Sequence, residues 1–147
     1  MKTLIFLLSI ISIQLYAPPS GPLPSKEQSF QFQIITNPLY RAYYPLIKAV
    51  VYVESRGNDS AFNRLEGAKG QYQVRLCRLI EFNKLTGKNY SHDEMYDYFK
   101  ATEVFLYFTN SRDYQTIARC WAGGEHGTRK ATNNYWALVN NRLISQI

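Results

Sequence analysis

The sequence predicts a mainly α-helical fold with at most a small β-hairpin. In several stretches apolar residues recur every three or four positions, which is the spacing that gathers side chains on one face of a helix. Residue types that favour helix starts, and glycines that favour helix ends, separate these stretches. About six helices with short connections are expected, and a chain of 147 residues is long enough for one domain with a single hydrophobic core.

The best-defined helix precedes Glu54. Asn37 is suited to cap its N-terminus, and Pro38 suits the first helical position. Glu54 falls in the last turn, and Gly57 or Asn58 can adopt the left-handed conformation that ends a helix. The apolar face of this helix is formed by Leu39, Tyr43, Leu46, Ile47, Val50 and Val51. The sequence therefore places a carboxyl group where an amphipathic helix stops.

Further helices are expected after a loop over 58–69. Gly67 and Gly70 allow the backbone to approach either a substrate or a neighbouring helix closely, and a small hairpin is expected near 68–74. Four more helices are expected. One lies over 76–85, and a long one over 93–108 follows a capping box formed by Ser91 and Glu94. Another runs from Asp113 to Gly123-Gly124, and the last begins after Thr132.

The composition is that of a basic, globular protein. Hydrophobic residues make up 46% of the chain, charged residues make up 19%, and the net charge is +6. This balance excludes an intrinsically disordered chain. The positive charge favours an anionic partner such as nucleic acid, acidic lipid or a cell-wall polymer. No run of Lys or Arg exceeds two residues, so a basic nucleic-acid-binding arm is not indicated.

Residues 1–17 have the character of an export signal. A Lys is followed by an apolar stretch that is short for a membrane span, and then by Ala17, after which cleavage is expected. An uncleaved membrane anchor is the alternative. Residues 18–36 begin rich in Pro and Ser and are expected to form an extended tether, with the folded domain over 37–147. We therefore expect an exported protein of the periplasm, cell envelope or extracellular space, and we favour a monomer.

The cysteine and histidine positions indicate neither a metal ion nor a cofactor. His92 and His126 are far apart in sequence, and no acidic or thiol cluster with metal-ligand spacing accompanies them. Cys77 and Cys120 are the only cysteines. Export would permit a disulfide between them, and two buried thiols are the alternative.

Glu54 is the first candidate catalytic residue. Its expected position at the negative end of a helix dipole, beside apolar side chains, disfavours the ionised carboxylate. A carboxylic acid that stays protonated near neutral pH can act as a general acid. The alternative is a Glu that lies exposed near a helix end and has no catalytic role.

Three segments, in a fixed order, resemble a known family. They are Glu54-Ser55, segment 67–74 and segment 117–124. Together they resemble the lysozyme-like domain of the soluble lytic transglycosylases, which are related to goose-type lysozymes. That family carries Glu-Ser, then Gly-x-x-Gln, then an aromatic-Asn-Gly-Gly segment before a final helix with an early Tyr. The resemblance covers about 38–143 and implies a lysozyme-like helical domain.

The resemblance also implies roles for the matching positions. Glu54 matches the single catalytic acid/base of the family. The residues expected to bind substrate are Ser55, Tyr72, Gln73, Gly123 and Tyr135, of which Tyr135 is the candidate for the late Tyr of the family. Tyr72 stands where the family more commonly has an apolar residue, which is a mild departure. Ala122 departs from the pattern, because it stands where the family has Asn before Gly-Gly and cannot make the polar contact of an Asn side chain.

The activity implied by the resemblance is cleavage of the β-1,4 bond between N-acetylmuramic acid and N-acetylglucosamine in peptidoglycan glycan strands, with 1,6-anhydro products. A hydrolase would need a second carboxylate to direct water, for which Glu66, Asp93 and Asp97 are candidates by position, and we favour the transglycosylase. Ala122 motivates a further alternative, an exported peptidoglycan-binding domain without catalysis. The charge alone suggests a protein that acts on membranes or nucleic acid, but that reading leaves the ordered segments unexplained.

Overall fold

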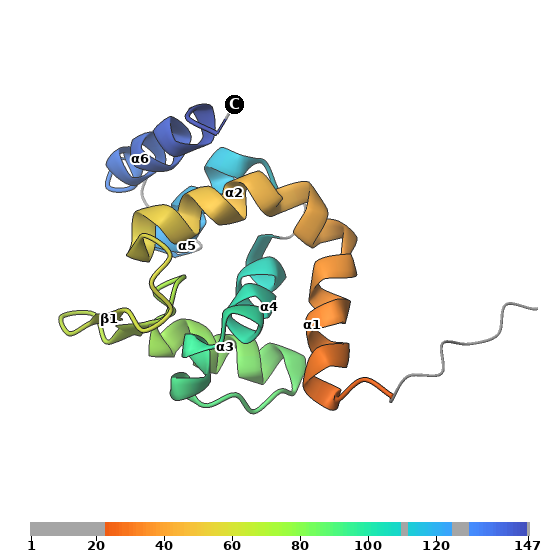
Figure 1. Ribbon diagram of the computed structural model, residues 1–147. Coiled ribbons are helices and arrows are strands. Elements are labelled where there is room, and N and C mark those ends of the chain that lie inside the picture. The colour runs from red at the N-terminus through yellow and green to blue at the C-terminus, as the bar shows by residue number, and fades with distance from the viewer. Residues whose placement is uncertain (1–22, 110–111, 125–129, 147) are drawn as a thin grey trace, which may run out of the picture.

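The protein is a helical domain with one short antiparallel hairpin (Figure 1). A computed structural model describes residues 23–109, 112–124 and 130–146. The elements are α1 (Lys26–Thr36), α2 (Pro38–Ser55), β1 (Phe62–Asn63), β2 (Ala68–Lys69), α3 (Leu76–Thr86), the 3₁₀ helix η1 (His92–Tyr96), α4 (Tyr98–Thr109), α5 (Tyr114–Gly123) and α6 (Asn133–Ile144). This architecture confirms the mainly α-helical fold with a small hairpin. Within the described ranges, no helix has both the length and the apolar character that crossing a membrane requires.

The long helix α2 runs through the middle of the fold. Asn37 caps it, because its Oδ1 accepts a 2.8 Å hydrogen bond from the backbone N–H of Leu39. The left-handed conformation expected at Gly57 or Asn58 begins one residue earlier, at Arg56 (φ 55°), and continues at Gly57 (φ 80°). The buried face of α2 consists of Tyr43, Leu46, Ile47, Ala49, Val50 and Val51. Both ends and the buried face thus follow from local sequence.

The first helix, α1, contradicts the second half of the tether expected over 18–36. Ser25 and Gln28 form a capping box, in which Ser25 N donates to Gln28 Oε1 at 2.9 Å and Gln28 N donates to Ser25 Oγ at 3.1 Å. Ile34 is buried, and α1 packs against α2 and α4. The folded part of the chain therefore begins before residue 37.

The helix expected over 93–108 is divided into η1 and α4. The backbone is extended at Asp97, and the carboxylate of this residue accepts hydrogen bonds from Phe99 N at 2.8 Å and Lys100 N at 3.0 Å. A side chain that caps a helix in this way competes with continuation of the preceding turn. Asp97 therefore separates the two helices.

The hairpin is fixed against η1 by a close backbone approach at Gly70. This residue has φ 73°, and a Cβ atom there would lie 1.9 Å from the carbonyl oxygen of Met95. Only glycine fits such a contact. The sequence left open whether these glycines approach a substrate or a neighbouring helix. At Gly70 the close neighbour is the helix η1.

Segments that are far apart in sequence meet around the C-terminal half of α2. Figure 1 shows α5 and α6 beside α2, with α3 and α4 on its other side and α1 across one end. The last helix, α6, packs against both α2 and α5. The largest fully buried side chains include Tyr72, Phe82, Phe105, Leu46 and Ile47. This packing brings the N-terminal part of α6 to the end of α2 that carries Glu54.

Candidate active site

A pocket of about 240 Å³ opens beside the C-terminal end of α2. Its walls come from α2, from the segment around the hairpin, from the start of α3 and from the end of α5. The lining residues are Glu54, Glu66, Gln73, Arg75, Cys77, Arg78, Glu81, Trp121, Ala122, Gly123 and Gly124. All three segments that carry the family resemblance therefore contribute to one pocket.

Glu54 is a largely buried carboxyl group whose pKa is raised. Burial raises the pKa of Glu54 from its usual 4.5 to about 7, and the nearby charge of Glu66 acts in the same direction. Two groups act in the opposite direction, namely the hydroxyl of Tyr135, which donates to Glu54 Oε1 at 2.7 Å, and the cationic Arg75. Burial outweighs both. A carboxyl group with this pKa can give up a proton and take it back near neutral pH.

Tyr135 reaches Glu54 from the far end of the chain. It lies near the start of α6, and its hydroxyl is the group that donates to the Glu54 carboxyl. Burial raises the pKa of Tyr135 well above its usual value of 10, so the phenol stays protonated and remains a donor. The structure thus brings together two of the residues singled out in the sequence.

Ser55 and Gln73 organise the backbone around the pocket. Ser55 Oγ donates to Gln71 O at 2.9 Å, which ties the end of α2 to the turn after the hairpin. Gln73 adopts φ 50°, and its Nε2 donates to Gly70 O at 2.9 Å and to Ala61 O at 3.3 Å. Gln73 lines the pocket, whereas the Ser55 hydroxyl is directed to protein backbone.

Tyr72 is a core residue, so the prediction that its side chain binds substrate is wrong. The side chain has no exposed surface. Its hydroxyl forms a 2.8 Å hydrogen bond with Thr102 Oγ1, and its ring packs against Phe105 and Trp121. The carbonyl of Tyr72 also accepts a 3.1 Å hydrogen bond from Trp121 Nε1. Tyr72 therefore supports the pocket from behind, while the next residue, Gln73, lines it.

Gly123 and Ala122 form the pocket wall at the end of α5. A Cβ atom on Gly123 would lie 2.6 Å from Thr132 Cγ2, so the glycine allows the residue that precedes α6 to pack closely. Ala122 presents only a methyl group at a position that lines the pocket. The departure from the family pattern therefore lies in the candidate site itself.

Of the three carboxylates considered for directing a water molecule, only Glu66 lines the pocket. Glu66 Oε2 accepts a 3.0 Å hydrogen bond from Arg75 Nε. Asp93 instead pairs with Lys69, whose Nζ lies 2.5 Å from Asp93 Oδ1, and Asp97 caps α4. The structure thus removes Asp93 and Asp97 from the candidates.

Sequence reasoning missed the charged residues that α3 and the residue before it contribute to the pocket. Arg75, Arg78 and Glu81 follow one another at three-residue intervals, and all line the pocket. Arg78 Nη2 donates to Cys120 O at 3.0 Å, and its guanidinium lies 4.6 Å from the centre of the Phe108 ring. These charged residues follow the Gly-x-x-Gln segment directly, and residues three apart lie on the same face of a helix. This spacing is the signal in the sequence that could have identified them.

The cysteines and histidines do not form a site in the described part of the chain. No group of three or more His, Cys, Asp or Glu side chains there could hold a metal ion. His92 Nε2 lies 2.8 Å from Val74 O, and His126 lies outside the described residues. Cys77 and Cys120 are both free thiols, the first exposed and the second half-buried. The structure therefore contains no Cys77–Cys120 disulfide, and the thiols are not both buried.

No protein-family model, curated protein or solved structure matches this chain. Chemically, the pocket offers one carboxyl group with a raised pKa that is oriented by a phenol, two guanidinium groups and an amide side chain. These groups suit proton transfer to a polar, uncharged or anionic substrate.

Proposed function

We propose that this protein is a lytic transglycosylase. It cleaves the β-1,4 bond between N-acetylmuramic acid and N-acetylglucosamine in peptidoglycan, with Glu54 as its single acid/base. The observation that carries the proposal is the Glu54 carboxyl, held by Tyr135 in a pocket to which all three ordered segments contribute. Its pKa of about 7 makes it a proton donor at neutral pH. The separation of these segments in sequence makes their convergence a stronger argument than any one motif.

The proposed reaction uses a hydroxyl group of the substrate in place of water. Glu54 donates its proton to the glycosidic oxygen, the bond between this oxygen and the anomeric carbon breaks, and positive charge develops on the muramic acid ring. The acetamido oxygen of that sugar stabilises the charge. The 6-hydroxyl of the same sugar then attacks the anomeric carbon and returns a proton to Glu54. One C–O bond replaces another, and the carboxyl group is again protonated.

Glu66 is the observation that favours a hydrolase as the second candidate. It lines the same pocket as Glu54, and a carboxylate in this place could accept a proton from an attacking water molecule. Its side chain is paired with Arg75. This pairing indicates a structural or electrostatic role for Glu66. The transglycosylase reaction requires no second carboxylate, and we therefore prefer it.

The test is mass spectrometry of the products from purified peptidoglycan, treated with the protein or with its Glu54→Gln variant. We expect muropeptides lighter by one water molecule, and a loss of roughly 10²- to 10⁴-fold in rate for the variant. Glu27→Gln removes an exposed carboxylate from α1 and serves as the matched control, with unchanged activity.

Three other results would change the proposal. Full activity of Glu54→Gln would remove Glu54 from the reaction. Products with ordinary reducing ends would identify a hydrolase. Binding to peptidoglycan without any product would identify a non-catalytic binding domain, and Ala122 in the pocket wall would then explain the lost chemistry.

A further inference from the structure

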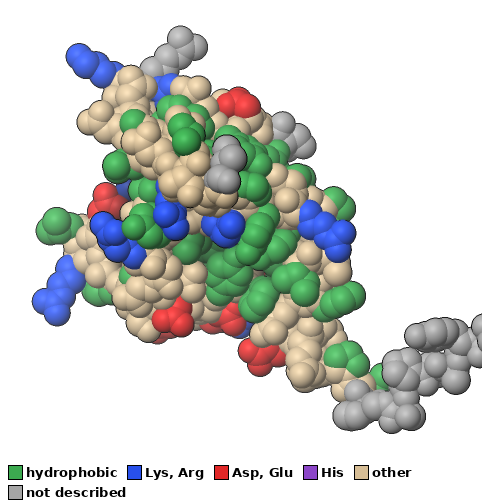
Figure 2. Space-filling model, turned by 45° about the horizontal axis from the view of Figure 1, so that its top comes forward, with side chains coloured by type: hydrophobic (Ala, Val, Ile, Leu, Met, Phe, Trp, Pro, Cys, Tyr) green, Lys and Arg blue, Asp and Glu red, His purple; other side chains and the backbone are tan. Residues whose placement is uncertain are grey.

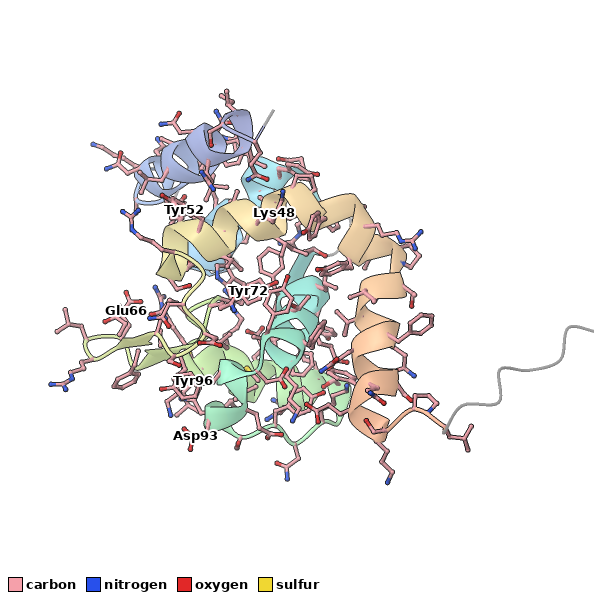
Figure 3. All side chains as sticks on the ribbon, in the orientation of Figure 1. Lys48, Tyr52, Glu66, Tyr72, Asp93 and Tyr96 are labelled. Atoms are coloured by element: carbon pink, nitrogen blue, oxygen red, sulfur yellow. The ribbon has the colours of Figure 1, made fainter. Side chains whose placement is uncertain are left out.

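A second surface of α2 carries alternating aromatic and basic side chains. Tyr44, Lys48, Tyr52 and Arg56 follow one another at four-residue intervals and are all exposed. This spacing places them along one side of the helix, and Arg142 of α6 joins them beside Tyr52. Figure 3 shows Lys48 and Tyr52 along α2, and Figure 2 shows basic side chains across the middle of one face. We call these five residues the basic face; none of them lines the Glu54 pocket.

The cations of the basic face are held in place by aromatic rings. The guanidinium of Arg142 lies 4.0 Å from the centre of the Tyr52 ring, and that of Arg56 lies 5.3 Å from it. Arg56 Nη1 also donates to the Tyr52 hydroxyl at 3.0 Å. Lys48 Nζ lies 5.1 Å from the centre of the Tyr44 ring. Stacking of this kind orders a guanidinium before any ligand arrives, so less conformational entropy is lost on binding.

These cations have no acidic partner among the residues that the structure describes. Elsewhere, cations such as Lys69 and Lys100 pair with carboxylates. Two pockets of about 370 and 280 Å³ flank Tyr52, and Arg56 and Arg142 line both of them. Neither pocket has Asp or Glu in its lining. Like charges held close together without a counter-charge attract an anion to this place.

We propose that the basic face binds a linear polyol phosphate, a polymer of glycerol or sugar alcohols joined by phosphodiester groups. Paired guanidinium groups form charge-assisted hydrogen bonds with phosphate oxygens. Lys48 lies eight residues before Arg56, which is about 12 Å along a helix. Phosphates of one polymer chain can therefore contact both ends of the basic face at once. This binding does not involve Glu54 and does not depend on the proposed cleavage reaction.

The structure favours a polyol phosphate over two other anionic partners. Single-stranded nucleic acid binds through bases that stack on free aromatic faces, but the rings of Tyr44 and Tyr52 already stack with cations of the protein. Membrane-surface binding requires apolar side chains that insert into the bilayer. Tyr44 and Tyr52 are the aromatic side chains of the basic face, and each already has a cation of the protein over its ring.

The test is isothermal titration calorimetry of the full chain with poly(glycerol phosphate) at a fixed salt concentration. We expect saturable binding that weakens roughly tenfold or more in the R56Q/R142Q double variant. R64Q removes one exposed cation from the loop between the strands and should weaken binding by less than about twofold. Cleavage of peptidoglycan that lacks attached phosphate polymer should be the same for all three proteins.

Several outcomes would overturn the proposal. No binding of poly(glycerol phosphate) would do so, as would equal weakening by R64Q and by the double variant. Tighter binding to oligothymidylate or to phosphatidylglycerol vesicles, lost in the double variant, would identify nucleic acid or a membrane as the partner instead. Circular dichroism checks that the double variant is folded; if it is not, R56Q alone alters only an exposed side chain and should still weaken binding more than R64Q.

Discussion

Glu54 and Arg56 are two residues apart at the end of α2, yet they lie in opposite environments. Glu54 lies in the last turn of α2, whereas Arg56 follows the helix in the left-handed conformation (φ 55°), which directs the chain away from the helical path. Glu54 faces a pocket in which burial outweighs the attraction of nearby donors. Arg56 is exposed, and its guanidinium lies over the Tyr52 ring together with that of Arg142. Neither has an acidic partner among the residues that the structure describes. One helix end thus provides an acid with a raised pKa on one side and fixed positive charge on the other.

The difference shows that solvent access, more than local sequence, decides how these charged residues behave. An exposed cation keeps its charge at almost no cost in folding free energy, whereas a buried carboxyl group favours its neutral form. If this comparison is correct, the carboxyl side of α2 should respond strongly to pH. The guanidinium side should respond chiefly to salt.

Glu54→Gln should have the largest effect on stability. The pKa of Glu54 is about 7 in the folded protein and 4.5 in an exposed chain. The folded state therefore binds more protons between these values, and the free energy of unfolding falls as the pH rises from about 4.5 to 7. Gln has nearly the same size and no charge, so the variant should be more stable by about 3 kcal/mol at pH 8 and unchanged at pH 4. Urea denaturation at the two pH values measures this.

Arg56→Gln is the control from the other side of the helix. Its side chain is exposed, so the free energy of unfolding should change by less than about 0.5 kcal/mol at both pH values. A stability gain for Glu54→Gln that is equal at pH 4 and pH 8 would contradict the description of Glu54 as a buried acid.

Tyr135→Phe should have a smaller effect, of about tenfold in kcat/KM, because one hydrogen bond that orients the acid is lost. The Tyr135 hydroxyl lowers the pKa of Glu54, so its removal should raise that pKa. The pH above which activity declines should therefore move upward, which a pH profile of kcat/KM measures. Tyr114→Phe, which removes a hydroxyl bonded to Ala42 O far from Glu54, should leave the profile unchanged.

Much of the fold could be predicted because its signals are local. Asn37 and the periodic apolar residues of α2 define that helix within the sequence itself. The same reasoning missed α1, since the Pro- and Ser-rich residues before it outweighed the Ser25–Gln28 capping box. It also missed the break at Asp97, because an amphipathic pattern can continue across a helix cap.

The candidate site could be predicted from the sequence only in part. Glu54 and Gln73 could be found because each belongs to a short motif, and both line the pocket. The burial of Tyr72 depends on α4 and α5, and the arrival of Arg78 at the pocket depends on how α3 packs near Cys120. Such contacts join residues at least 30 positions apart, so no spacing within a motif reveals them.

Glu66→Gln should have the smallest effect and should act in the direction opposite to Tyr135→Phe. The charge of Glu66 raises the pKa of Glu54, so its removal should lower that pKa. The alkaline limit of activity should then move to lower pH, while kcat/KM at acidic pH, where Glu54 is protonated in both proteins, stays the same. Glu81→Gln removes another carboxylate from the pocket lining and should not move the profile.

The same variant separates the two reactions that the pocket could perform. If Glu66 only influences the charge state of Glu54, the products of Glu66→Gln keep their 1,6-anhydro ends, and the change is confined to the pH profile. If Glu66 directs a water molecule, the activity falls at every pH, by roughly 10²-fold or more, and the wild-type products carry reducing ends. The hydrogen bond from Arg75 Nε to Glu66 Oε2 at 3.0 Å leads us to expect the first result, because it already holds this carboxylate in place against a protein side chain.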